Sequence, residues 1–160
     1  MGKGRPPKRK PIAPKLSELP VHLRELGHLV GTWNVKLRWS EATHRLVGGP
    51  IEVDMVIKIQ WLDASPWIHY WMGPAHWLIG GDEGRQEFVV LYTDGRPSPR
   101  VYRMTFNRGL WKIWRDAPGF RQRFEGRLTK NGRRIEARWD KAEGRKGWAR
   151  DFDLTFVRAG

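Results

Sequence analysis

Residues 31–39 read Gly-Thr-Trp-Asn-Val-Lys-Leu-Arg-Trp, and this stretch decides the fold class. Apolar residues at every second position alternate with asparagine, lysine and arginine, which is the pattern of a β-strand with one buried face. Residues 51–61 repeat the pattern over a longer segment, in which charged and amide residues separate the apolar ones. These two segments predict strands that each contribute one side to a common core.

More strand-like segments follow, and no helical period interrupts them. Turn-forming pairs such as Asn131-Gly132, which suits a two-residue hairpin turn, separate these segments. Nine or ten short antiparallel strands fit either a sandwich or an up-and-down barrel. No segment has the interior proline that often blunts an edge strand, which favours the barrel. The segments are 66–73, a short one at 75–80, 85–93, 100–107, 110–116, 119–129, 133–142 and 147–158.

The chain upstream of residue 31 has two different parts. Residues 1–15 contain six cations, four prolines and no acid, which predicts a disordered basic tail. In residues 16–30 leucine and valine recur three or four positions apart, which predicts a short helix with one apolar stripe against the core. We therefore expect a tail over 1–15 and one barrel domain over 16–160. The stripe consists of Leu19, Leu23, Leu26 and Val30.

The composition limits the classes of function. The net charge is +13, of which the tail supplies six, so an acidic partner such as nucleic acid must be considered. There are no cysteines, which excludes a disulfide framework and thiolate metal sites. No stretch approaches the roughly 20 apolar residues of a membrane span, and no apolar run follows the N-terminal cations, so we expect a cytoplasmic protein.

Antiparallel closure of the last strand onto the first predicts a specific register. It places Arg158, at the end of the last strand, beside Trp33 at the start of the first. There the guanidinium either contacts the indole or lies in solvent at the end of the strand. The same register places Arg150 opposite Glu41 at the open mouth of the barrel. A buried arginine needs an anionic or polar partner, and Glu41 is the partner that this register supplies.

The segment Leu29-Val30-Gly31-Thr32-Trp33 resembles the Gly-x-Trp element that opens the first strand of lipocalin-like (calycin) barrels, after a short helix that plugs one end. The resemblance implies that an arginine of the last strand, here Arg158, covers the tryptophan, with Gly31 and Trp33 completing the closure. Thr93-Asp94 is followed by Gly95, unlike the Thr-Asp-Tyr element of secreted lipocalins. The chain is most similar to bacterial lipocalin-like proteins of unknown function, distantly related to the haem-binding nitrobindins. Nitrobindins have a histidine late in the chain, whereas no histidine follows His76 here. We therefore expect neither haem nor another cofactor.

Polar residues on the apolar phases of strands mark a candidate ligand site. We expect a small, largely apolar or aromatic ligand inside the barrel, held by an aromatic wall and a few polar groups. Two alternatives stay open: large rings fill the interior, or the Glu41–Arg150 pair is a solvated salt bridge at the rim. The candidate ligand-binding residues are His69, Trp67, Trp71, Trp114, Gln122, Arg150, Glu41 and Tyr102.

An enzyme with the same architecture is the second hypothesis. His69 or Asp116 would perform acid–base chemistry, and Arg150 would hold an anion. Arg115 and Asp116 lie beside the Pro118-Gly119 turn, where they could orient a substrate, although Asp116 could instead cap the turn. His69 and His76 are seven residues apart across Gly73-Pro74 and show no metal-ligand spacing, so we expect no metal site.

A nucleic-acid-binding or ribosome-associated protein is the third hypothesis. Arginines on the outward phases of two adjacent strands, together with cations in residues 3–15, could form a stripe that contacts phosphates. The alternative is a solvated face in which Glu125, Glu136 and Asp140 interleave with the arginines. A homodimer is also compatible with the composition. The stripe consists of Arg121, Arg123, Arg127, Arg134 and Arg138.

Overall fold

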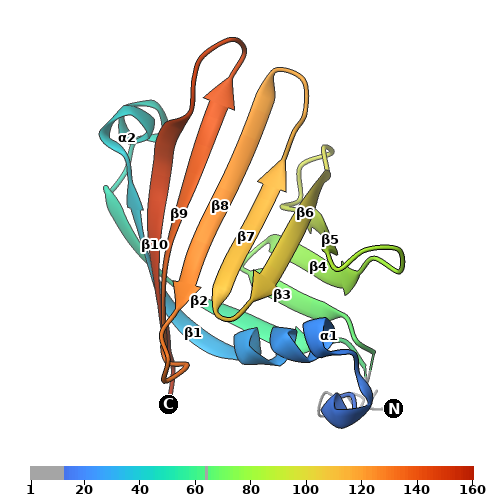
Figure 1. Cartoon of the computed structure of the whole chain (residues 1–160). Helices are drawn as coiled ribbons and strands as arrows, with labels where there is room; N and C mark the ends of the chain where they lie inside the picture. The colour runs from blue at the N-terminus through green and yellow to red at the C-terminus, as the bar shows by residue number, and fades with distance from the viewer. Residues whose placement is uncertain (1–12, 64) are drawn as a thin grey trace, which may run out of the picture.

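The computed structural model describes residues 13–63 and 65–160, and these form a closed antiparallel barrel of ten strands. Each strand pairs with its neighbour in the chain, and β10 also pairs with β1 (Figure 1). The predicted up-and-down barrel is confirmed. The strands are β1 (Gly31–Trp39), β2 (Glu52–Trp61), β3 (Ile68–Met72), β4 (Ala75–Gly81), β5 (Phe88–Thr93), β6 (Arg100–Asn107), β7 (Leu110–Arg115), β8 (Phe120–Leu128), β9 (Arg134–Glu143) and β10 (Ala149–Arg158).

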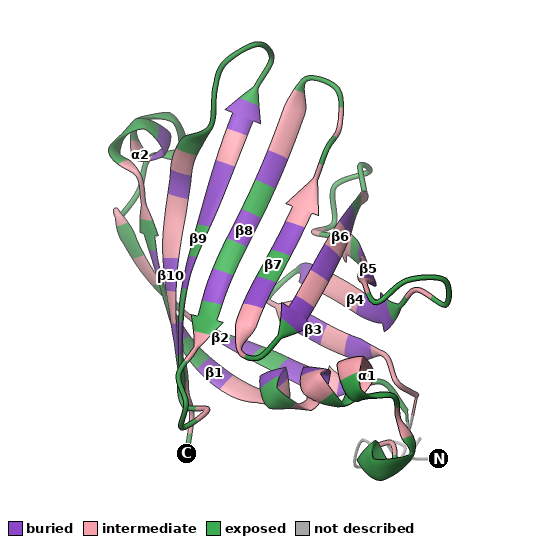
Figure 2. Cartoon of the chain, viewed as in Figure 1, coloured by how far each residue is buried: buried purple, intermediate pink, exposed green. Residues whose placement is uncertain are grey.

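The period-two pattern of the sequence is visible as alternating burial along the strands. Along β8, for example, buried Gln122, Phe124 and Gly126 alternate with exposed arginine and glutamate residues (Figure 2). The inward side chains of all ten strands form one core. Burial of this apolar area is the main favourable contribution to folding.

Three short helical segments cover one end of the barrel, which we call the helical end. They are η1 (Leu16–Glu18), α1 (Val21–Glu25) and η2 (Leu26–Leu29), and they lie at the lower end in Figure 1. Leu26 and Leu29 are fully buried, while Leu19, Leu23 and Val30 pack against the core. The predicted apolar stripe is therefore confirmed.

The register between β1 and β10 is the predicted one, with Trp33 opposite Arg158 and Trp39 opposite Phe152. The guanidinium carbon of Arg158 lies 4.1 Å from the centroid of the Trp33 ring. The guanidinium donates hydrogen bonds to the carbonyl oxygens of Val30 (2.7 Å), His28 (2.7 Å) and Gly132 (3.0 Å). One side chain thus joins the helical end, the barrel seam and the β8–β9 turn.

Gly31 is required where Arg158 crosses the seam. Its φ of 147° lies in the region that side chains disfavour, and an added Cβ would collide with Nη1 of Arg158. The missing side chain therefore makes room for the arginine. This contact gives a steric reason for glycine two positions before Trp33.

A second helix, α2 (Glu41–Val47), follows β1 and was not predicted. Ser40 ends the strand and caps the helix, because its Oγ accepts a hydrogen bond from the Thr43 backbone N–H at 3.2 Å. Glu41 is exposed in the first turn of the helix. It therefore does not continue the inward phase of β1, as the register prediction assumed.

A β-bulge in β10 changes the orientation of the residues at the start of this strand. The register shifts between Arg150 and Phe152, so that Asp151 is the extra residue. Asp151 is buried, whereas Arg150 forms an ion pair with Asp153 (Nη2–Oδ2 2.6 Å). The predicted Arg150–Glu41 pair is therefore wrong.

Aromatic rings fill the centre of the barrel. Only a void of about 20 Å³ remains there, which is room for about one water molecule. The expected ligand cavity is therefore absent from this part of the barrel, and the alternative of an interior filled by large rings is the one observed. The void is lined by Tyr70, Trp77, Ile79, Trp111, Ile113, Phe124, Trp139, Leu154 and Phe156.

We expect Arg158→Met to lower the free energy of unfolding by about 2–4 kcal/mol, because three carbonyl groups lose a charged donor and the indole loses its cation. Chemical denaturation measured by tryptophan fluorescence gives this value. Arg127→Met is the matched control, since this side chain is 71% exposed and its contact with Glu125 is 3.7 Å long. Equal stabilities of the two variants would contradict the role given to Arg158.

Candidate functional site at the mouth of the barrel

The end of the barrel opposite the helical end, which we call the mouth, carries a row of inward polar side chains. Register pairs Arg115 of β7 with Gln122 of β8, and Gln122 with Lys141 of β9. Tyr102 of β6 and the bulge residue Asp151 of β10 extend this row on either side. We call these five residues the polar arc.

A hydrogen-bond network holds the centre of the arc. The Tyr102 hydroxyl donates to Oε1 of Gln122 at 2.6 Å, and Nη1 of Arg100 donates to the same oxygen at 3.2 Å. The guanidinium carbon of Arg100 lies 5.2 Å from the centroid of the Phe120 ring. Burial raises the pKa of Tyr102, so its hydroxyl stays protonated and available as a donor at neutral pH.

The other end of the arc is tied to α2. The Thr43 hydroxyl donates to Oδ1 of Asp151 at 2.7 Å, and Nζ of Lys141 lies 3.6 Å from the same oxygen. Lys141 also lies 3.3 Å from Oε1 of Glu143. The helix after β1 is therefore attached to the mouth through the bulge residue.

Two of the inward cations have no carboxylate partner. Arg100 and Arg115 form no ion pair with any described residue, whereas Lys141 has both Asp151 and Glu143. Burial raises the pKa of Tyr102, and the positive charges of Arg100 and Arg115 partly oppose this increase. Both guanidinium groups therefore lie close enough to act on the Tyr102 hydroxyl. This part of the mouth therefore has a local excess of positive charge.

The mouth also has an aromatic wall next to the arc. The Trp77 ring stacks on Tyr102 with centroids 5.5 Å apart and lies edge-on to Tyr92 at 4.9 Å. Nε1 of Trp77 is buried and has no hydrogen-bond partner among the described residues. A buried donor without a partner is uncommon in folded proteins and indicates a place where a ligand or water can bind.

Tyr92 extends this wall toward the β5–β6 loop. Its hydroxyl donates to Oδ2 of Asp94 at 2.9 Å, and burial together with this hydrogen bond raises the pKa of Tyr92 to about 12. A side-chain hydrogen bond from Arg96 lowers the pKa of Asp94. Asp94 therefore remains a charged acceptor at the edge of the mouth.

Several sequence-predicted site residues lie elsewhere. In β3 the inward residues are Ile68, Tyr70 and Met72, so His69 and Trp71 face outward. Because β3 has large residues on both faces, alternation alone did not identify its core side. Trp67 packs over Gly80, and Trp114 lies on the outer surface, since Trp111 and Ile113 define the inward phase of β7.

Three sequence-predicted residues do lie at the mouth, namely Tyr102, Gln122 and Arg115. The neighbouring Asp116 is exposed and forms neither a side-chain hydrogen bond nor an ion pair with a described residue, so the turn-cap interpretation has no contact to support it. Arg100 and Lys141 were missed. Each lies two positions from a buried apolar residue of its strand and therefore on the inward face. This alternation could have been read from the sequence.

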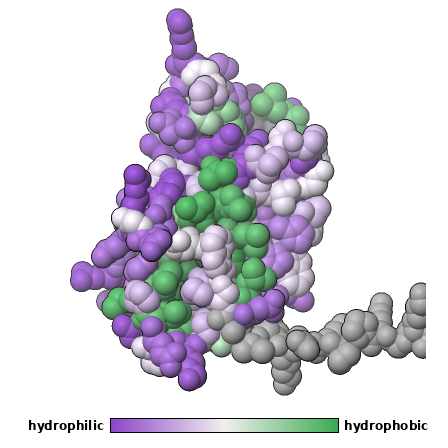
Figure 3. All heavy atoms as spheres, turned by 90° about the vertical axis from the view of Figure 1, so that its right-hand side faces the viewer, coloured by the Kyte–Doolittle hydropathy of each residue, from purple (hydrophilic) through white to green (hydrophobic). Residues whose placement is uncertain are grey.

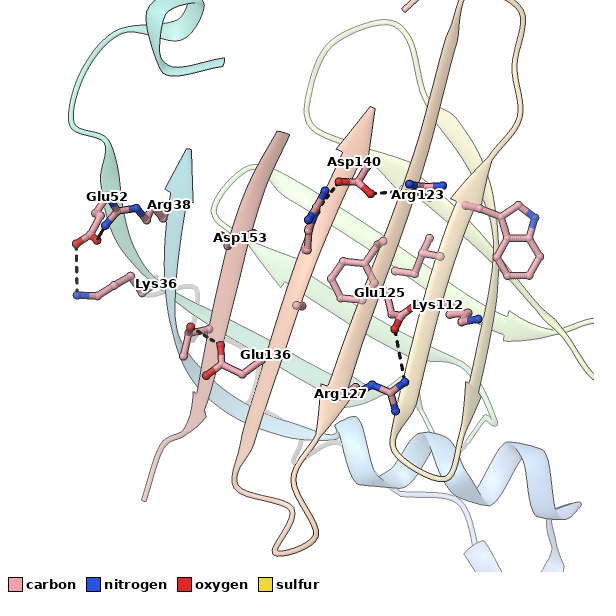
Figure 4. Close-up of a pocket in the computed structure, with 16 residues that line it drawn as sticks. Lys36, Arg38, Glu52, Lys112, Arg123, Glu125, Arg127, Glu136, Asp140 and Asp153 are labelled. Atoms are coloured by element: carbon pink, nitrogen blue, oxygen red, sulfur yellow. Dashed lines mark hydrogen bonds and ion pairs between the residues drawn. The ribbon is translucent and has the colours of Figure 1, made fainter. Parts of the chain in front are cut away.

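Four of the five arginines of the outer stripe pair with acids, whereas Arg121 lies over the Trp148 ring and forms no ion pair with a described residue. Arg123 and Arg138 both pair with Asp140, at 3.0 and 2.6 Å. Similar pairs join Arg127 to Glu125 and Arg134 to Glu136. Apart from Arg134, the residues of these pairs line an outer groove of about 990 Å³, in which cations and acids alternate across β1, β2 and β7–β10 (Figure 4). The interleaved face is therefore the interpretation that fits the structure.

A different side of the barrel carries apolar surface. Leu91 of β5 lies opposite Val101 of β6 and Leu78 of β4, and the side chains of Leu91 and Val101 are exposed. Figure 3 shows apolar side chains gathered in a band on one face of the molecule. The homodimer remains a prediction.

The described residues contain no group of three or more histidine, cysteine or acidic side chains placed to hold a metal ion. Among the same residues, no helix has the length and hydropathy needed to span a membrane. The basic-tail prediction falls largely on residues 1–12, which lie outside the described part of the chain.

No family model and no curated protein matches the chain. Among solved structures, a crystal structure of Rv2717c from M. tuberculosis is similar, with a TM-score of 0.42 and 11% sequence identity. The similarity covers 89% of this chain and 100% of that one. The fold and site define a closed ten-stranded antiparallel barrel with a polar mouth, and the similarity assigns neither a family nor a ligand.

We expect all three tyrosines to resist ionisation in the folded protein. Burial raises the pKa of Tyr70, Tyr92 and Tyr102, whereas unfolded tyrosine ionises near pH ~10. Absorbance at 295 nm should therefore show much less phenolate at pH ~10.5 in the native protein than in 6 M guanidinium, where the three tyrosines titrate near pH ~10. This stabilisation is complete below the unfolded pKa and is lost as pH rises toward the folded pKa values. A phenolate signal near pH ~10 in the native protein would contradict the described packing.

Proposed function

We propose that this protein binds a small, largely aromatic molecule with an anionic group, and that the ligand binds at the mouth of the barrel. The observation that carries the proposal is the pair of inward guanidinium groups of Arg100 and Arg115, which lack carboxylate partners. A carboxylate, sulfonate or phosphate on the ligand would supply the missing charge. Arginine suits this role because its planar group binds such anions through two parallel hydrogen bonds.

The aromatic preference follows from the wall beside these cations. Trp77, Tyr92 and Tyr102 present ring surface next to the polar arc, and flat apolar ligands pack well on such rings. Nε1 of Trp77 offers a donor for an oxygen on the ligand. A molecule with one flat apolar part and one anionic end therefore matches both sides of the mouth.

The packing of the interior supports the mouth rather than the barrel centre as the binding position. The central void of about 20 Å³ is too small for a drug-sized ligand, whose pockets are on the order of 300 Å³ or more. A ligand at the centre would have to displace several buried rings.

The other two functional hypotheses have less support. Of the acid–base residues named for an enzyme, His69 lies on the outer face of β3, and Asp116, although next to Arg115, is exposed and forms no side-chain hydrogen bond or ion pair with a described residue. Arg150 pairs with Asp153. The nucleic-acid hypothesis depended on an arginine stripe that the structure shows interleaved with acids. It now rests mainly on the cations of residues 3–15.

The first test compares 2-naphthoate with 2-naphthamide, which share a ring system and differ in charge. We expect naphthoate to bind and to change the tryptophan emission, and Arg115→Gln to weaken its binding about tenfold, the effect of losing roughly 1.4 kcal/mol of charge-assisted hydrogen bonding. Arg100→Gln should have a similar effect. Fluorescence titration and isothermal calorimetry measure both.

Arg127→Gln is the control, since it removes the same charge from the outer face and should leave the affinity for naphthoate unchanged. Naphthamide should bind the wild type more weakly, and its affinity should not depend on Arg115. Equal affinity of the wild type for both probes, or no binding of either one, would overturn the proposal.

A further inference from the structure

His69 and His76 form an outward pair on the hairpin of β3 and β4. Register places His69 opposite Leu78 and His76 opposite Trp71, so the two histidines are diagonal neighbours. Nε2 of His69 lies 2.9 Å from Nδ1 of His76. The sequence spacing of seven residues gave no indication of this contact, which arises because the turn at Gly73-Pro74 folds β3 and β4 onto one another.

The rings are oriented so that their nitrogens point at each other. The two ring planes differ by only 14°, and the ring centroids are 5.1 Å apart, farther than the nitrogens themselves. The nitrogens therefore lie between the rings, which meet edge to edge. Only one proton can occupy the space between them, so one imidazole donates and the other accepts through its lone pair.

We propose that this pair is a binding site for one divalent transition-metal ion of the zinc, nickel and copper class, which takes the place of the shared proton. Imidazole nitrogen is a ligand that these ions prefer, whereas magnesium and calcium prefer oxygen. Zinc binds imidazole nitrogen at about 2.0–2.1 Å, which places two such nitrogens about 3.3 Å apart at a tetrahedral ion. The imidazoles thus need to separate by a few tenths of an ångström and to rotate.

The surroundings of the pair favour metal binding of moderate strength. His76 is exposed and His69 is partly exposed, so both rings can move and solvent can complete the coordination. Gln60 and Thr93 lie opposite His69 and His76 on the adjacent strands and are uncharged.

One nearby charge and one nearby ring affect the design of the test. Nζ of Lys58 lies 5.2 Å from the centroid of the Trp71 ring, so a cation is present near the pair and limits the affinity. The Trp71 ring stacks on His69 with centroids 5.5 Å apart. A bound copper or nickel ion should therefore quench the emission of Trp71, which gives a local readout.

The binding experiment uses the full chain without a histidine tag and titrates ZnCl₂ or NiCl₂ by calorimetry at pH 7.5. We expect one ion per chain, at least tenfold weaker binding in His69→Gln and in His76→Gln, and unchanged binding in His28→Gln. His28 is an exposed histidine outside the pair, which makes it the matched control. Binding should weaken as pH falls to 5.5, because protons compete for the nitrogens, and MgCl₂ should give no binding.

Two further results locate the ion and separate this site from the mouth. Quenching by CuCl₂ should be largely lost in Trp71→Phe although its affinity for zinc remains, and naphthoate binding should be the same in His69→Gln and wild type. If the wild type shows no zinc or nickel binding at millimolar metal, or if the double variant H69Q/H76Q binds as tightly as wild type, the metal site is ruled out. Circular dichroism confirms that each variant is folded.

Discussion

The Arg158 guanidinium at the seam between β1 and β10 is the contact on which the rest of the structure depends. It lies over Trp33 and donates to carbonyl oxygens from the helical end and from the β8–β9 turn. These segments are far apart in the sequence, and each would otherwise leave a carbonyl without a charged donor. Closing the seam removes both sheet edges, so every strand has two partners and the mouth is held as a ring.

Much of this architecture could be predicted from the sequence, because its physical signal is local. Alternation in β1 and β2 identified strands with a single buried face, and one register then followed for β1 and β10. The failures have equally local causes. In β3 large residues lie on both faces, so His69 and Trp71 were assigned to the wrong one. In β10 one extra residue changed the phase, and in α2 the capping role of Ser40 was missed.

The candidate site was harder to predict than the fold, because it crosses the strands rather than following one of them. Gln122 stood out within its own strand as a polar residue between two phenylalanines. Arg100 and Lys141 can be recognised as site residues only when the strand register shows which polar side chains lie next to them around the mouth. Asp151 could not be found by alternation at all, since the bulge that turns it inward breaks that pattern. The histidine pair likewise depends on how tightly the β3–β4 hairpin turns.

The bulge also places a negative and a positive side chain on opposite faces of the barrel wall at the start of β10. Asp151 is turned in toward Thr43 and Lys141, while the adjacent Arg150 stays outside with Asp153. Without the bulge, strict alternation from the inward Phe152 would point Asp151 outward and Arg150 inward. The barrel would then gain a third guanidinium at its opening and lose its inward aspartate, and the helix after β1 would lose its anchor. The sign of the electric field at the entrance is thus set by one inserted residue as much as by the number of arginines around it.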